Sequence, residues 1–408
     1  MTNDANKWFW VWLSGLGLFI LAASTGVLMR FGIIMGFPYG LQYTNVRHAH
    51  SHLMYFGWVT PALMGLILTW LPRVTERPLS PQHQKQFRIV LIIIFILSVA
   101  AYSAFMLYGY RPASVGDLSL PISTILASFN MLAWYGFIFV YWRATKGLER
   151  KRPLSLRLWD AGLAFMVLAS LGAWGVAVTV IFNMRDPVLS AALTHLFLDT
   201  FSEGWFVLTL LGLAYAVTPQ AATHPWASKS ENLLIMGMPV VFLLTVPVTS
   251  LPPFVRLIAS IGGLMVGIGL WGNIVILWRA SSSAWRFPLV FLALKATTGL
   301  IITIPTLAIW AERSLLRVSY LHWLLLGFVS GGLIVVAEIT WEKTRVPARR
   351  WFNITVVILI LTLIPLTPLW PPALSGMWPR QAAAVATLGP VIVMIIMFAK
   401  GLIASRQP

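Results

Sequence analysis

The stretch Asn45–Val59, NVRHAHSHLMYFGWV, places three histidines directly before an apolar run. His48, His50 and His52 are three of only seven histidines in the chain. Ionisable side chains are costly inside a membrane, so histidines that open a membrane-spanning segment are candidates for function. Helix positions i and i+2 point about 200° apart. We therefore expect one of the three to be a ligand, with the others at the surface or in a second site.

The rest of the chain is as apolar as the end of this stretch. Of its 408 residues, 58% are hydrophobic and 10% are charged, and the mean hydropathy is +0.81. Apolar runs long enough to cross a bilayer recur from end to end. We predict an all-α polytopic membrane protein that forms one bundle domain over residues 1–408, with about twelve transmembrane helices. The predicted spans are 8–29, 51–71, 89–110, 120–142, 158–182, 190–217, 232–251, 257–278, 287–310, 319–341, 352–370 and 382–403.

The net charge of +17 comes from basic residues that are unevenly distributed. Most of the 29 basic residues lie at the N-terminus, at the C-terminus and in the even-numbered connections between predicted spans. This bias predicts that both termini are cytoplasmic and that the protein is multi-pass in the cytoplasmic (inner) membrane. It also favours contact of the basic loops with anionic lipid headgroups over nucleic-acid binding.

Cysteine is absent from the chain. That excludes disulfides, thiolate metal sites, iron–sulfur clusters and covalently attached c-type haem. Any metal must therefore be bound by histidine, carboxylate, tyrosine or methionine. A c-type haem relay would have to come from another subunit.

The sixth predicted span contains the segment HLFLDTFSE, residues 195–203. His195, Asp199 and Glu203 are spaced i, i+4 and i+8, so on an α-helix they form one polar stripe. Two carboxylates and one imidazole on a stripe can bind a cation or pass protons. A hydrogen-bonded strip that holds helices together is the structural alternative.

His322, in the tenth predicted span, lies near the outer end of its helix. The predicted topology puts His50 at the same membrane depth. Two facing helical imidazoles at one depth meet the requirement for bis-His ligation of a haem b. The alternative for a single histidine in a span is a hydrogen-bonded packing role.

Lys295 and Glu338 are also ionisable residues in predicted spans. Lys295 is predicted to pair with Glu203, Glu338 or a haem propionate, unless its ammonium group reaches the cytoplasmic interface. Glu338 is expected near the cytoplasmic end of the tenth span, where water reaches it.

Together these features resemble the catalytic subunit of the haem–copper oxidase superfamily, in particular the large subunit of bacterial nitric oxide reductases. That family is a twelve-helix bundle with cytoplasmic termini. Its second helix carries Arg-x-x-His before an apolar run, which here corresponds to Arg47 through His50, followed by LTWLP. The resemblance implies that His50 and His322 are the ligands of a low-spin haem b. Tyr320 stands where the family has the histidine of a second haem.

The segment HLFLDTFSE resembles the reductases' His-x-x-x-Glu-x-x-x-Glu motif, which implies that His195 binds a non-haem metal beside Asp199 and Glu203. The family's two adjacent histidines in the seventh helix are missing, so the second metal site is degenerate. The segment HSHLMYFGW, residues 50–58, also echoes the His-x-His of membrane haem proteins of nitrosative stress, which implies a cofactor role for His52.

Three functions remain open on this sequence. The first is a haem b protein that carries electrons from a quinol or a cytochrome, with additional subunits as candidate partners. The second is an oxidoreductase that reduces NO or O₂ at a second centre, with Tyr320 on a second haem or with iron, manganese or zinc on the carboxylates. The third is a redox-inactive relative that acts as a proton or cation transporter or as a membrane scaffold.

Overall fold

The computed structural model describes residues 6–148, 152–182, 184, 186–342 and 345–406. Among them, twelve helices are long and apolar enough to cross a membrane, as predicted. Their bounds are Phe9–Met35, Tyr43–Thr75, Pro81–Tyr108, Ile122–Thr145, Leu154–Thr179, Pro187–Val217, Ala227–Thr245, Pro253–Ala280, Ser283–Ile301, Arg317–Trp341, Arg349–Leu366 and Met377–Ser405.

The described chain divides into two compact units. The first unit comprises residues 1–150, 337–366 and 370–408, and the second comprises residues 151–336 and 367–369. The prediction of a single domain stays a prediction.

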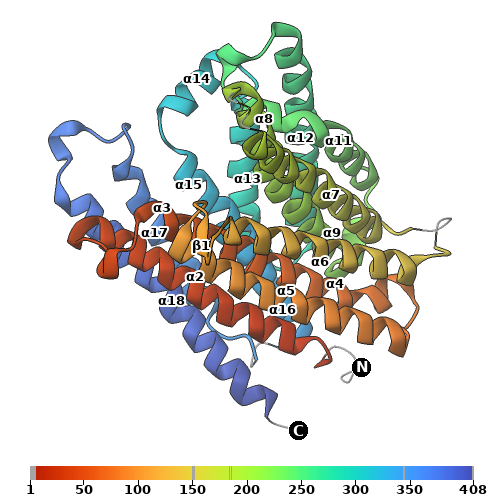
Figure 1. The fold of residues 1–408 in the computed structure, drawn as a ribbon. Coiled ribbons are helices and arrows are strands. Elements are labelled where there is room, and N and C mark those ends of the chain that lie inside the picture. Colours follow the sequence, from red (N-terminus) through yellow and green to blue (C-terminus); the bar gives the residue numbers. More distant parts are fainter. Residues whose placement is uncertain (1–5, 149–151, 183, 185, 343–344, 407–408) are drawn as a thin grey trace. The chain divides into compact units, whose positions relative to one another are not determined.

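The first unit is built on the packing of α2 against α18 and of α5 against α6, which lie side by side in Figure 1. Its elements are α2 (Phe9–Met35), η1 (Pro38–Gly40), α3 (Tyr43–His52), η2 (Leu53–Val59), α4 (Thr60–Thr75), α5 (Pro81–Tyr108), β1 (Ala113–Val115), β2 (Leu118–Leu120), α6 (Ile122–Thr145), α17 (Arg349–Leu363), η8 (Ile364–Leu366), η9 (Pro372–Leu374) and α18 (Met377–Ser405). The strands β1 and β2 form a short antiparallel hairpin that the sequence analysis did not predict.

The second unit is built on α11 against α12 and on α7 against α8 and α9. Its elements are α7 (Leu154–Ile181), α8 (Pro187–Asp199), η3 (Thr200–Val207), α9 (Leu208–Val217), α10 (Pro219–Ala222), α11 (Ala227–Val241), η4 (Phe242–Thr245), η5 (Val248–Ser250), α12 (Pro253–Ala280), η6 (Ser283–Trp285), α13 (Arg286–Ile301), α14 (Pro305–Arg313), α15 (Arg317–His322) and η7 (Trp323–Ser330). The helix α16 (Gly331–Trp341) begins in this unit and ends in the first.

Local sequence explains several helix ends. The hydroxyl of Ser80 accepts a hydrogen bond from the backbone N–H of His83 and caps α5, whose first residue is Pro81. Asp186 caps α8 in the same way, with its carboxylate accepting from two backbone N–H groups. The predicted ninth span, 287–310, does not form one continuous helix. The helix α13 ends at Ile301, and Pro305, which cannot continue a helix, begins α14.

Three of the twelve spans are far more buried than the rest: Tyr43–Thr75, Pro187–Val217 and Arg317–Trp341. They are the second, sixth and tenth in the chain. In each, the α-helix gives way to a π-helical segment, and these segments are η2, η3 and η7. Each π-helical segment begins within three residues after a histidine or carboxylate that the sequence analysis selected. Because π-helical turns are rare and are frequently found at functional sites, this pattern makes the three spans candidates for a functional site.

Candidate functional site

His50 lies inside helix α3, not at its mouth, because this helix begins at Tyr43, eight residues before the predicted start of the span. Its Nδ1 lies 2.7 Å from the carbonyl oxygen of Ala22 on α2. A carbonyl only accepts, so Nδ1 carries the proton and the lone pair is on Nε2. This is the tautomer that a metal ligand needs, with its second nitrogen held by a backbone carbonyl.

Gly26, one turn further along α2, lies against the same imidazole. A Cβ atom at this position would be 3.1 Å from Cε1 of His50 and 3.3 Å from Nδ1. A Cβ atom at position 26 would therefore require the ring to move by a few tenths of an ångström. Arg30, which the sequence analysis did not select, follows one turn later and interacts electrostatically with His50. The i, i+4, i+8 spacing of Ala22, Gly26 and Arg30 places the three residues on one face of α2.

His48 and His52 contact the aromatic residues at the end of α5 instead. The ring of His52 stacks on Phe105 with centroids 3.9 Å apart, and its Nε2 lies 3.3 Å from the hydroxyl oxygen of Tyr110. The ring of His48 meets the ring of Tyr110 at 4.7 Å. His50 thus contacts α2, whereas His48 and His52 contact residues at the end of α5 and just after it. The cofactor role of His52 stays a prediction.

Two residues beside this cluster complete its surroundings. Arg47 is exposed and its guanidinium lies over the ring of Tyr43, 5.9 Å from the centroid. Partial desolvation raises the pKa of the Tyr110 phenol although its side chain is 55% exposed, and the nearby charge of Arg47 opposes this in part. Tyr110 is therefore a neutral hydrogen-bonding neighbour of His52 at physiological pH.

In the second unit, Glu203 is the centre of a buried ion pair. Nζ of Lys295 on α13 donates to its Oε2 at 2.9 Å, and the hydroxyl of Tyr320 on α15 donates to its Oε1 at 2.8 Å. The side chain of Lys295 is only 3% exposed and that of Glu203 is 13% exposed. This pairing is one of those that the sequence analysis left open for Lys295.

His195 and Asp199 form a second polar group in the same unit. Nδ1 of His195 and Oδ2 of Asp199 are 2.9 Å apart, and the hydroxyl of Thr245 also donates to this carboxylate. Arg317 lies close by, with Nη2 3.5 Å from His195 Nδ1. Thr245 and Arg317 were not predicted from the sequence because both lie at element ends, where spacing along a helix carries no signal.

The predicted stripe of His195, Asp199 and Glu203 crosses a change of helix type. The π-helix η3 begins directly after Asp199, and its wider turn means that four residues no longer complete a turn. Within residues 6–148, 152–182, 184, 186–342 and 345–406, no group of three or more histidine or acidic residues is close enough to hold a metal ion. The three-residue ligand set is therefore not gathered in this structure.

The remaining predicted residues are His322 and Glu338. Nδ1 of His322 lies 2.7 Å from the carbonyl oxygen of Val318, one turn earlier on its own helix, so the lone pair is again on Nε2. Glu338 pairs with Arg349 through a 2.6 Å contact between Oε2 and Nε, within the first unit. This ion pair gives Glu338 a structural role.

The comparison with solved structures agrees with this architecture. The chain is similar to a chain from a cryo-EM structure of a heme-copper terminal oxidase dimer, with a TM-score of 0.76 and 13% sequence identity. The match covers 100% of the present chain and 85% of the other. No family model matches the chain, and no curated protein matches it. The predicted all-α polytopic bundle with this fold is thus confirmed, and the closer resemblance to nitric oxide reductases stays a prediction.

Proposed function

We propose that the chain is a membrane haem b protein that transfers electrons, and that the haem would be held by His50 and, as the resemblance implies, by His322. The observation that carries the proposal is the imidazole of His50, whose Nδ1 is held 2.7 Å from the carbonyl oxygen of Ala22. Fixing Nδ1 in this way presents the Nε2 lone pair, which is how proteins prepare a histidine for a metal. His322 is prepared in the same manner by Val318.

The residues around His50 fit a haem ligand. A bound haem supplies one-electron chemistry, and axial ligands and their hydrogen-bond partners set its potential. The carbonyl of Ala22 holds the imidazole and raises its basicity, while Gly26 leaves the space in which the ring lies. Arg30 adds a positive charge near His50, where it would offset the negative charge of propionates.

A non-haem metal does not fit the residues of the second unit. Both oxygens of Glu203 already accept hydrogen bonds, one from Lys295 and one from Tyr320. The ammonium group supplies the positive charge that a metal would otherwise bring. A cation bound between His195, Asp199 and Glu203 would have to displace Lys295. The proposal therefore includes no reduction of NO or O₂ at a metal held by these residues.

The second unit is better suited to holding protons. Glu203, Lys295 and Tyr320 form a chain of groups that exchange protons, and such chains mark proton pathways in membrane proteins. This observation favours a second candidate function, a proton or cation transporter or a membrane scaffold without redox activity. The two functions differ in whether substitution of His50 or His322 abolishes activity.

The chain's partners follow from the proposed function. An electron carrier in a bilayer requires a donor, which we propose to be a quinol or a cytochrome in the inner membrane, with additional subunits. The experiment that tests the proposal is quantitation of haem b in the purified protein, together with its His50 and His322 variants.

A further inference from the structure

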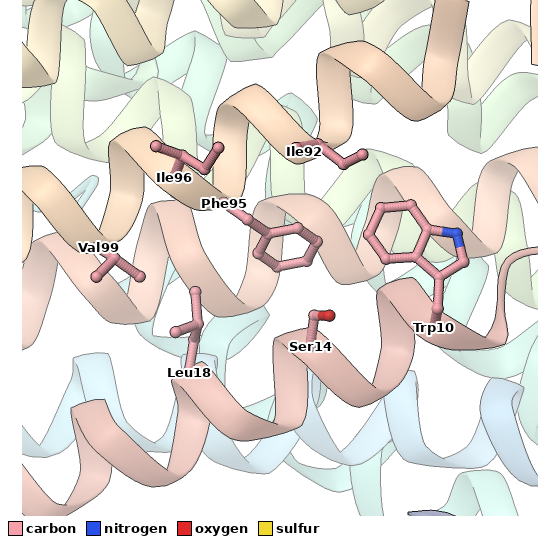
Figure 2. A pocket seen from close by; sticks show the side chains of 7 residues that line it. All are labelled: Trp10, Ser14, Leu18, Ile92, Phe95, Ile96 and Val99. Carbon is pink, nitrogen blue, oxygen red and sulfur yellow. The ribbon is translucent and has the colours of Figure 1, made fainter. Parts of the chain in front are cut away.

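A groove of about 210 Å³ runs between α2 and α5 in the first unit. Figure 2 shows side chains from the two helices pointing toward each other across it. It is lined by Trp10, Ser14, Leu18, Ile92, Ile96 and Val99. Phe95 also borders the groove, with its ring 6.0 Å from that of Trp10.

The groove lies on the membrane-spanning parts of both helices. Ile96 is 62% exposed and Ile92 is 43% exposed, so the groove opens toward the surroundings of the unit. From Trp10 to Leu18 it extends about 12 Å, at 1.5 Å per residue. One leaflet of the hydrocarbon core is about 15 Å thick. An acyl chain therefore matches the groove in polarity and in length.

Basic residues lie N-terminal to the lining residues of both helices, on α5 itself and just before α2 begins. On α5, Lys85 and Arg88 precede Ile92 by seven and four residues, which places them on the same face. Both are exposed. On the other side, Lys7 precedes Trp10 by three residues. Where the structure describes the first turns of α2 and α5, neither contains an acidic residue.

Trp10 lies at this basic end of the groove. Indole rings prefer the headgroup level of a bilayer, so Trp10 indicates that the basic end lies at the interface. The charge distribution of the whole chain predicts the cytoplasmic side, which carries the anionic lipids. The apolar groove, which is about as long as one leaflet is thick, thus ends beside basic residues at the level of the lipid phosphates.

We propose that this groove is a specific site for one anionic phospholipid. One acyl chain lies between α2 and α5, and the phosphate is bound by Lys85 and Arg88, with Lys7 adding to the positive field. Each basic residue near the membrane surface contributes about a factor of five to the affinity for an anionic lipid. The site is independent of the proposed redox function, because it uses none of the histidines.

The test is native mass spectrometry of the full chain in detergent, titrated with dioleoyl phosphatidylglycerol or dioleoyl phosphatidylcholine. We expect one phosphatidylglycerol to be retained by the wild type and preferred over phosphatidylcholine. The double variant Lys85→Gln/Arg88→Gln is expected to bind it about 25-fold more weakly. The matched control is Arg143→Gln/Lys146→Gln at the end of α6, which removes two exposed charges away from the groove.

The groove itself is tested by Ile96→Trp, which fills it from an exposed position that tolerates a larger side chain. Ser14→Trp fills it from the opposite helix. We expect both variants to lose the retained lipid while keeping the wild-type unfolding temperature within a few degrees. Equal binding of the two lipids, equal loss in the Arg143/Lys146 control, or full retention by both tryptophan variants would each overturn the proposal.

Discussion

Lys295 and Glu203 form an ion pair of 2.9 Å within the membrane-spanning part of the second unit, and both side chains are largely shielded from solvent. Lys295 thus binds the carboxylate of Glu203, which the sequence predicts to be a metal ligand. A charge buried alone is costly, so each partner depends on the other.

The variant Lys295→Met is expected to lower the free energy of unfolding by about 3–5 kcal/mol, because it leaves the Glu203 carboxylate without its cation. The double variant Lys295→Met/Glu203→Gln should regain most of this loss, since the amide oxygen still accepts from Tyr320. Denaturant unfolding in detergent measures both variants. The ion pair is not formed if Lys295→Met is as stable as the wild type. It is also not formed if the stability losses of the single variants Lys295→Met and Glu203→Gln simply add in the double variant.

Tyr320 separates two accounts of the second unit. Its hydroxyl donates to Glu203, so Tyr320→Phe should cost about 1.5–3 kcal/mol of stability, the range for a hydrogen bond to a charged group, and leave the haem content unchanged. If Tyr320 instead provided a phenolate ligand to a second haem, the same variant would lose one haem per chain. Pyridine haemochrome quantitation distinguishes the two outcomes.

The glycine beside His50 provides a test on the opposite helix. A side chain at position 26 crowds the imidazole, so Gly26→Val should lower the haem content by moving the ring from where Ala22 holds it, and such overpacking costs about 1–3 kcal/mol of folding stability. The control is Gly17→Ala on the same helix, where a Cβ meets only the ring of Phe398 at an ordinary 3.7 Å. The haem content after gel filtration reports the effect. An equal loss in both variants would point to a general weakening of α2.

The stability of the first unit should depend on alkaline pH through Tyr110. Desolvation raises its pKa above the usual value near 10 although 55% of the side chain is exposed, so at higher pH the folded protein keeps a proton that the unfolded chain has released. The unfolding free energy must then decrease as the pH rises above about 10. Tyr110→Phe should flatten this decrease, whereas Tyr39→Phe, at a fully exposed side chain, should not. Thermal unfolding between about pH 9 and pH 11 measures the slope.

The sequence predicted the fold well because the bilayer imposes length and polarity on each span. All twelve spans were found, and the largest errors were at their ends. The histidine cluster lies within helix α3 because Tyr43 to Arg47 continue the helix beyond the apolar run. A hydropathy profile does not detect such a polar extension of a helix.

The site was predicted less completely, for two physical reasons. The spacing of His195, Asp199 and Glu203 assumes an α-helix, and the π-helix that starts at Thr200 invalidates this assumption for Glu203. The partners of His50 lie on another helix, where Ala22 contributes only a backbone carbonyl and Gly26 only the absence of a side chain. Neither kind of contribution has a side-chain signature, so spacing within one span cannot reveal it.

The most direct test of the account is a reduced-minus-oxidised optical spectrum of the purified protein with pyridine haemochrome quantitation. It should include the His50→Ala and His322→Ala variants and, as controls, His83→Ala and His224→Ala in the connections. The account predicts a sharp reduced α-band and at least one haem b per chain in the wild type and the controls, and loss of the low-spin signal in the other two variants. A wild-type protein without Soret absorbance, or full haem retention in both ligand variants, would contradict it.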